Sequence, residues 1–278
     1  MILALLSALA VALNGLAGGF ASRKIGVVLV LAIAAPVSLV VAVLALAVES
    51  NVPTARGILL GLVAGLRGGF GILMSYRALQ IGPIGIASAI TACTAVTVAS
   101  VWGLATQGGV SVLRVFAIIL CLFAIGLVSY RRNAGKLQLS ASLFAIAAGV
   151  VFGFFQILMN ATDESDGWWP LVMVRAGVWV IAWGFLLHYL SSRGRPSLGS
   201  IPPWVWTVPA IAGTMDALGN VFLILALRVE ELAVVAIMTS VTPAVTAVLG
   251  WLVLAEKLSR MQLVGLGTAI VALALATL

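Results

Sequence analysis

The chain has 278 residues, of which 63% are hydrophobic and only 8% charged, with a formal net charge of +7 and a mean hydropathy of +1.24. A soluble domain carries about a quarter charged residues, so this composition excludes a water-soluble fold. The cations stand singly or in pairs beside apolar runs and form no phosphate-binding patch, so no nucleic acid is expected as a partner.

Ten apolar runs follow one another along the chain, each about the 20 residues that span a hydrocarbon core. The runs are continuous rather than alternating, which favours helices over a barrel. The expected fold class is therefore all-α and integral to a lipid bilayer, with ten transmembrane helices. The predicted spans are residues 2–21, 26–47, 57–79, 84–106, 112–130, 141–161, 169–190, 204–227, 232–254 and 260–277.

The two halves of the chain are similar. A shift of 148 residues (213 − 65) superposes Gly65 on Gly213, and the same shift superposes Thr91 on Thr239 and helix ends on helix ends. We expect a first five-helix repeat at 1–130, a cytoplasmic-type linker at 131–140 and a second five-helix repeat at 141–278. Because five is an odd number of crossings, the second repeat is expected to be inverted, the architecture of alternating-access transporters.

The basic residues predict an orientation. Loops after even-numbered spans carry only Arg56, Arg114 and Arg228. Cations concentrate in cytoplasmic loops, so the count places the loops after odd-numbered spans in the cytoplasm and both termini outside. Those odd-numbered loops carry Arg23, Lys24, Arg77, Arg131, Arg132, Lys136, Arg193, Arg195, Lys257 and Arg260.

Several segments resemble a known family. The stretch 65–83 and its counterpart 216–228 each contain a glycine-bearing helix that ends in an Ala-Leu pair. The segment 239–246, with Pro243, resembles a proline-containing ninth span, and 254–258 resembles the turn "G-E-[RK]-L" that follows it. Arg175 resembles the arginine of the seventh span. The chain thus resembles the drug/metabolite transporter superfamily, EamA-like ten-helix branch.

The resemblance implies a secondary transporter in the plasma (inner) membrane that moves small metabolites by alternating access. Amino acids or similar amphipathic solutes are the implied substrates, and export the implied direction. The resemblance also implies cytoplasmic termini, against the charge count. Ala95 departs from the family pattern by replacing the proline of the fourth span, and Gly108-Gly109 replace its Glu-Arg turn.

Other functions remain open from the residues alone. A proton-coupled efflux pump for drugs or toxic cations is the first alternative, and a channel or an intramembrane enzyme follows. The chain shows neither a nucleotide-binding loop nor an HExxH, paired-carboxylate or Ser/His/Asp arrangement, so we expect no enzymatic activity, cofactor or metal. A monomer and a homodimer both stay open.

Three charged residues lie deep in the predicted spans: Arg67, Arg175 and Asp216. Such a charge costs about 2.5–3.5 kcal/mol at a helix centre, so each is expected to have a role. Asp216 and Asn220 are four residues apart and share a helix face. Two interpretations stay open: both residues line a polar cavity, or Asp216 is a counter-ion for Arg67 or Arg175.

The candidate cavity residues are polar or aromatic side chains within the spans. Each threonine hydroxyl among them is able to bind a solute or to bond back to the carbonyl four residues earlier, and Pro243 frees one such carbonyl. A stripe at Gly57, Gly61, Gly65 and Gly69 predicts a close helix contact. The candidates are Asn14, Tyr76, Thr91, Thr94, Trp102, Gln156, Asn160, Trp179, Asp216, Asn220, Thr239 and Thr242.

Overall fold

The computed structural model describes residues 1–47, 52–107, 112–129, 136–193, 201–229, 238–239, 241–256 and 258–275. Within these residues every regular element is a helix. The elements are α1 (Ile2–Ile25), α2 (Val27–Leu46), α3 (Ala55–Ile81), α4 (Ile84–Gln107), α5 (Val112–Ser129), α6 (Lys136–Asn160), η1 (Glu164–Asp166), α7 (Trp169–Arg193), η2 (Pro203–Trp206), α8 (Val208–Val229), α10 (Thr242–Leu254) and α11 (Arg260–Leu275).

Each predicted span falls on one of these helices, so the protein is an all-helical integral membrane protein. In the described part of the chain, six helical segments are long and apolar enough to cross a bilayer, namely α1, α2, α3, α6, α7 and the pair η2–α8. Shorter apolar stretches lie in the other four described α-helices. The ninth span is described only from its middle, because residues 230–237 and 240 lie outside the described part. α6 begins at Lys136, so residues 136–140 of the predicted linker are helical, whereas 131–135 are not described.

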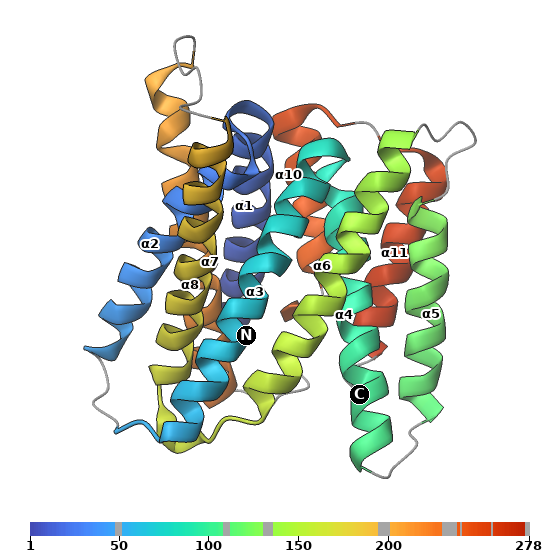
Figure 1. The fold of residues 1–278 in the computed structure, drawn as a ribbon. Coiled ribbons are helices and arrows are strands. Elements are labelled where there is room, and N and C mark those ends of the chain that lie inside the picture. The colour runs from blue at the N-terminus through green and yellow to red at the C-terminus, as the bar shows by residue number, and fades with distance from the viewer. Residues whose placement is uncertain are drawn as a thin grey trace.

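The helices cross the molecule in alternating directions (Figure 1). In the view shown, α1, α3, α5 and α7 end at the upper side, which we call the odd face, and α2, α4 and α6 end at the lower side, the even face. The predicted loop cations Arg131, Arg132, Arg195 and Lys257 lie outside the described residues. The direction of the odd face, towards the cytoplasm or away from it, stays a prediction.

The packing partners exchange between the two halves of the chain. α1 packs on α8 while α3 packs on α6, and α2 packs on α8 while α3 packs on α7. Three further pairs join corresponding helices directly: α2 with α7, α4 with α10, and α5 with α11. Two repeats related by a pseudo-two-fold axis would give this pattern, although the repeat boundaries themselves remain predictions.

Small residues make up most of the interior, and many large apolar residues face outward. Alanines dominate the fully buried positions, whereas side chains such as Leu5, Val40 and Phe116 are exposed. Lipid tails are as apolar as leucine, so a membrane protein gains little by burying large side chains and gains close helix packing from small ones. Cys93 and Cys121, predicted as small core residues, are free thiols buried in the cluster between α4, α5 and α11.

The predicted glycine stripe of α3 lies against α7. A Cβ atom added at Gly61 would lie 2.6 Å from the carbonyl oxygen of Pro170, and one at Gly65 would clash with the backbone of Val174. At Gly69 the added atom would lie 2.7 Å from Cβ of Ile181. The stripe therefore lets two backbones approach to a distance that any side chain on α3 would prevent.

A proline inside α2 explains another contact of α7. Pro36 has no N–H group, so the carbonyl of Ala32, four residues earlier, loses its helical partner. The indole Nε1 of Trp183 donates to this carbonyl at 3.2 Å. A side chain of α7 thus satisfies the backbone group that Pro36 leaves free, as a polar group in lipid requires.

Candidate functional site

An ion pair occupies the middle of the membrane-spanning bundle. Asp216 lies midway between Pro203 and Val229, the ends of the η2–α8 span. The Arg175 side chain on α7 donates through Nη1 to Oδ2 of Asp216 and through Nη2 to the Asp216 carbonyl at 3.3 Å. Of the two interpretations for Asp216, its role as a counter-ion therefore has a definite partner, Arg175.

Two polar side chains from the first half of the chain extend this pair. Asn14, near the midpoint of α1, donates through Nδ2 to Oδ1 of Asp216 at 3.3 Å, and it accepts a bond of 2.9 Å from the hydroxyl of Tyr76 on α3. Gly18 on α1 makes room for the Tyr76 ring, since an added Cβ would overlap it. The chain Tyr76–Asn14–Asp216–Arg175 thus links four helices across the two halves, and we call it the central network.

Asn220 belongs to the same helix face as Asp216, as its spacing predicted. Its side-chain amide donates to the Asp216 carbonyl at 2.8 Å, so this carbonyl accepts from both Asn220 and Arg175. The carbonyl of a helical residue ordinarily accepts only from the residue four positions later. These additional bonds fix the backbone that carries the Asp216 carboxylate.

The two charges of the central network differ in exposure. The Arg175 side chain is 5% exposed and that of Asp216 is 23% exposed. Nε of Arg175 is buried and has no acceptor among the residues that the structure describes. The site therefore offers a partly accessible carboxylate and, beside it, a guanidinium that still has a donor to give.

The candidate threonines bond mainly to backbone carbonyls. Thr94 donates to the Ile90 carbonyl at 2.8 Å, and Thr91 donates to the Ala145 carbonyl on α6 at 3.2 Å. Thr242 donates at 2.6 Å to the carbonyl of Thr239, which is the group that Pro243 frees. Their hydroxyls thus already have acceptors and stabilise the helices, and a solute would have to compete for them.

Other candidates lie apart from the central network. The Arg67 side chain is exposed on α3, and of the two predicted counter-ions of Asp216 it is Arg175 that forms the pair. Gln156 and Asn160 are exposed on the even-face end of α6. Trp102 is 49% exposed on α4, and Trp179 is 38% exposed on α7, where it packs against Trp183. The position of a residue in a span predicts its depth in the membrane but not the side of the helix on which its side chain lies. For this reason the sequence did not distinguish these residues from those of the central network.

Two further interactions between the halves of the chain were not predicted from the sequence. Arg23 and Glu256 form an ion pair of 2.7 Å at the odd face. Only the turn motif around Glu256 pointed towards it. The Ser7 hydroxyl on α1 donates to the Gly219 carbonyl on α8 at 2.7 Å, one turn from the central network.

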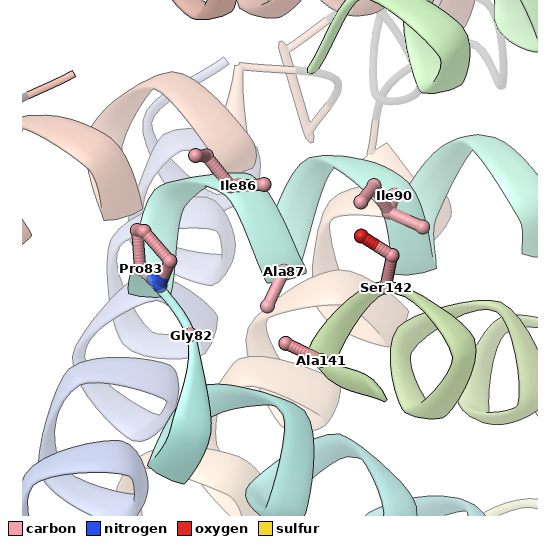
Figure 2. A pocket seen from close by; sticks show the side chains of 7 residues that line it. All are labelled: Gly82, Pro83, Ile86, Ala87, Ile90, Ala141 and Ser142. Carbon is pink, nitrogen blue, oxygen red and sulfur yellow. The ribbon is translucent and has the colours of Figure 1, made fainter. Parts of the chain in front are cut away.

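A pocket lies near the odd face rather than at the central network. It is a partly open recess between the α3–α4 turn and the first turns of α6, without room for a solute (Figure 2). Its lining residues are Gly82, Pro83, Ile86, Ala87, Ile90, Ala141 and Ser142. Ser142 alone contributes a polar side chain. This pocket lacks the charged and hydrogen-bonding groups that a polar solute needs, so we place the candidate site at the central network.

These features define a polytopic helical membrane protein whose charged centre is shared by helices from both halves of the chain. The second half, residues 139–278, matches the sequence profile of the EamA-like transporter family. The chain belongs to this family, which is part of the drug/metabolite transporter superfamily and has a membrane-transporter fold.

A solved structure shares the fold over nearly its whole length. Its title reads only "Crystal structure of protein", and it superposes with a TM-score of 0.64 at 13% identity over 99% of this chain and 96% of that chain. At this identity the likeness shows the fold alone. No curated protein matches the chain in sequence.

Proposed function

We propose that this membrane transporter moves small zwitterionic or amphipathic solutes, such as amino acids, through the central network by alternating access. The observation that carries the proposal is the Arg175–Asp216 pair at mid-depth, joined to both halves of the chain through Asn14 and Tyr76. Charged groups in the interior of a membrane bundle mark solute and ion pathways. Many transporters bind their solute near the midplane, at the interface between two repeats, and the exchanged packing of the two halves supports such an interface here.

The chemistry of the pair suits a solute with both charges. A solute ammonium group finds an acceptor in Asp216, whose Oδ1 accepts a bond of 3.3 Å from Asn14 and whose side chain is partly exposed. A solute carboxylate finds a donor in Nε of Arg175. Since the pair is neutral overall, a neutral zwitterion replaces internal contacts without leaving an unpaired charge in the bilayer. A solute with a single charge would leave either Arg175 or Asp216 without a partner.

Export across the plasma (inner) membrane is the proposed direction and location. The chain has no sequence motif for nucleotide binding, so the driving force is proposed to be a solute or ion gradient. The central network lies within one chain, so a monomer suffices for the proposed pathway, and a homodimer would hold two separate pathways. A channel would more simply form by symmetric assembly around a pore.

A thermal-shift screen of the purified protein in detergent tests the solute class. Amino acids, sugars, nucleotides and cationic drugs are compared, since a ligand that binds only the folded state raises the unfolding temperature. We expect zwitterionic amino acids to stabilise the protein and uncharged sugars to have no effect. Stabilisation by sugars or nucleotides alone would overturn the proposed class.

Proton-coupled efflux of cations is the second candidate, favoured by the partly exposed carboxylate of Asp216. Protonation of this carboxylate would release a bound cation and weaken its pair with Arg175. In proteoliposomes, uptake of a cationic substrate driven by an imposed pH gradient would support this candidate. Uptake of a zwitterion that is indifferent to the gradient would exclude obligatory proton coupling.

A further inference from the structure

An ion pair ties the two halves of the chain together at the odd face. Arg23 lies in the last turn of α1, and its Nη2 donates to Oε1 of Glu256 at 2.7 Å. The same guanidinium donates to the carbonyls of Leu79, at 3.1 Å, and Gly82, at 2.8 Å, where α3 ends. A single arginine thus joins the ends of α1 and α3 to the turn after α10.

The second carboxylate oxygen of Glu256 accepts a hydrogen bond from another helix, α4. Its Oε2 accepts from the backbone N–H of Ile84 at 2.8 Å, in the first turn of α4. The first N–H groups of a helix have no partner within it and carry partial positive charge, which a carboxylate stabilises. Glu256 therefore holds α4 and α1 at the same time, although it follows α10 in the other half of the chain.

The backbone before Glu256 adopts a conformation that favours glycine. Ala255 has φ 52° and ψ 33°, the only positive φ at a residue other than glycine in the described part of the chain. Gly250 supplies the space for the carboxylate, because an added Cβ would lie 3.0 Å from Oε2. The strained turn and the open position together aim Glu256 at Arg23 and Ile84.

The helices that Arg23 and Glu256 join also carry residues of the central network. The two helices that Arg23 joins, α1 and α3, carry Asn14 and Tyr76, so their ends at the odd face are fixed while their middles contact Asp216. The Ile84 side chain is fully buried beneath the ion pair and would contact any side chain at Gly19 of α1. These contacts hold the ends of α1 and α3, the start of α4 and the turn after α10 together at the odd face.

We propose that the Arg23–Glu256 pair is the latch of the odd face, which breaks when the transporter opens its central network to that side. Both side chains remain partly exposed, 29% for Arg23 and 12% for Glu256, so water is able to solvate the charges once they separate. A fully buried pair would resist opening, since separated charges would have no solvent. The latch goes beyond the proposed solute class, and only its role in transport rests on the proposed function.

The rate of thiol labelling measures how often the odd face opens, and it needs no substrate. The reporter is Ile84→Cys in a chain whose native thiols are replaced by Cys93→Ala and Cys121→Ala, labelled in proteoliposomes with a membrane-impermeant maleimide. The variants Arg23→Gln, Glu256→Gln and the double substitution are compared. Arg23→Gln keeps the bond from Ile84 to Glu256 and removes the ion pair together with the bonds to the Leu79 and Gly82 carbonyls. Glu256→Gln removes the ion pair but leaves those two carbonyl bonds to Arg23, so an effect shared by the two variants is that of the ion pair. Lys24→Gln, an exposed neighbouring cation, is the control.

We expect each single substitution to raise the labelling rate roughly fivefold, the change that corresponds to an ion pair of this exposure. The double variant is expected to label no faster than the faster single variant, because the two residues act on one interaction. Lys24→Gln should label like the parent. Equal rates in all variants, or additive effects of the two substitutions, would overturn the latch. Solute uptake by the parent protein, measured in the same vesicles, decides the proposed function separately.

Discussion

Arg175 illustrates how a charge is retained inside an apolar bundle. Its guanidinium is 5% exposed, and Asp216 provides both a carboxylate oxygen and a backbone carbonyl for it. Removing one partner of such a pair leaves the other charge unpaired, which costs about 3–5 kcal/mol where burial is complete, and less here because Asp216 is partly exposed. Charged groups inside a membrane bundle are most often functional, and this is the reason for proposing the pathway at this pair.

The strained turn at Ala255 gives a prediction for stability. A left-handed conformation costs an L-residue about 1–2 kcal/mol, which glycine avoids. Ala255→Gly is therefore expected to raise the free energy of unfolding by up to about 1 kcal/mol, measured by thermal unfolding in detergent. Ala47→Gly is the matched control, because Ala47 ends α2 in the right-handed region, at φ −67°. Stabilisation by both substitutions, or by neither, would refute the explanation.

Asp166 predicts a dependence of stability on pH. The Thr54 backbone N–H donates to its carboxylate at 2.7 Å, and this bond, with a second from the Asp163 backbone, holds the pKa of Asp166 below its ordinary value. A carboxyl with a lowered pKa stabilises the fold above its ordinary pKa of about 4 and loses this contribution as pH falls through the folded value. Asp166 lies in the α6–α7 connection, outside the membrane-spanning segments.

The unfolding temperature, measured between about pH 6 and about pH 3, where carboxyl groups titrate, tests the contribution of Asp166. The parent protein is expected to lose stability towards acid more steeply than Asp166→Asn, in which the titrating group is gone. Asp163→Asn, at an exposed neighbour, should follow the parent. A parent curve with the same slope as that of Asp166→Asn would show that the bond to Thr54 contributes nothing.

Part of the site was predictable from single residues. The cost of charge in lipid singled out Arg175 and Asp216, and the four-residue spacing placed Asn220 on the face of Asp216. The same reasoning also selected Arg67, whose side chain is exposed on α3. Depth along a span follows from the sequence, whereas the direction of a side chain depends on how neighbouring helices are rotated. The link from Asn14 to Tyr76 is a contact between helices, so no local pattern contained it.

At the scale of helices, small residues and prolines determine which elements meet. The four-residue glycine spacing in α3 predicted a close contact, and α7 is the helix that makes it. Its partner was not predictable, because a glycine stripe describes a surface but not what covers it. The break at Gly82 and Pro83 was predictable from the sequence, because the residue before a proline disfavours the helical conformation, and Gly82 is extended.

The contact between α3 and α7 predicts the effect of one methyl group. Gly65→Ala places a Cβ against the Val174 backbone, which cannot rotate away, so we expect a loss of about 1–3 kcal/mol in the free energy of unfolding. Gly184→Ala on α7 meets nothing within 4 Å and should be neutral or slightly stabilising. Unfolding in a detergent titration measures both. Equal effects of the two substitutions would contradict the close approach.

The pairing of Pro36 with Trp183 predicts a coupling between α2 and α7. Trp183→Phe removes the donor to the free Ala32 carbonyl and should cost about 1 kcal/mol. In a Pro36→Ala background that carbonyl accepts from residue 36, so the same substitution should cost much less. A double-mutant cycle by thermal unfolding gives the coupling. Additive effects would show that the indole bond does not compensate for the proline.

At the scale of the whole molecule, the two halves depend on each other. α1 packs on α8 and α3 on α6, and the central network and the Arg23–Glu256 pair both connect the halves. The similarity of the halves along the sequence predicted two related units, and the parity of five spans predicted their opposite directions. The exchange of partners required the structure, because it is a relation between units and not within them.

The central claim is that a transported solute passes the Arg175–Asp216 pair. The measurement that tests it most directly is uptake of the best-stabilising amino acid into proteoliposomes by the parent, Asp216→Asn and the exposed control Asp163→Asn, each normalised to folded protein. We predict that Asp216→Asn lowers the uptake rate about tenfold or more, because the solute then meets an unpaired arginine, while Asp163→Asn transports like the parent. Uptake by Asp216→Asn at the parental rate would contradict the claim.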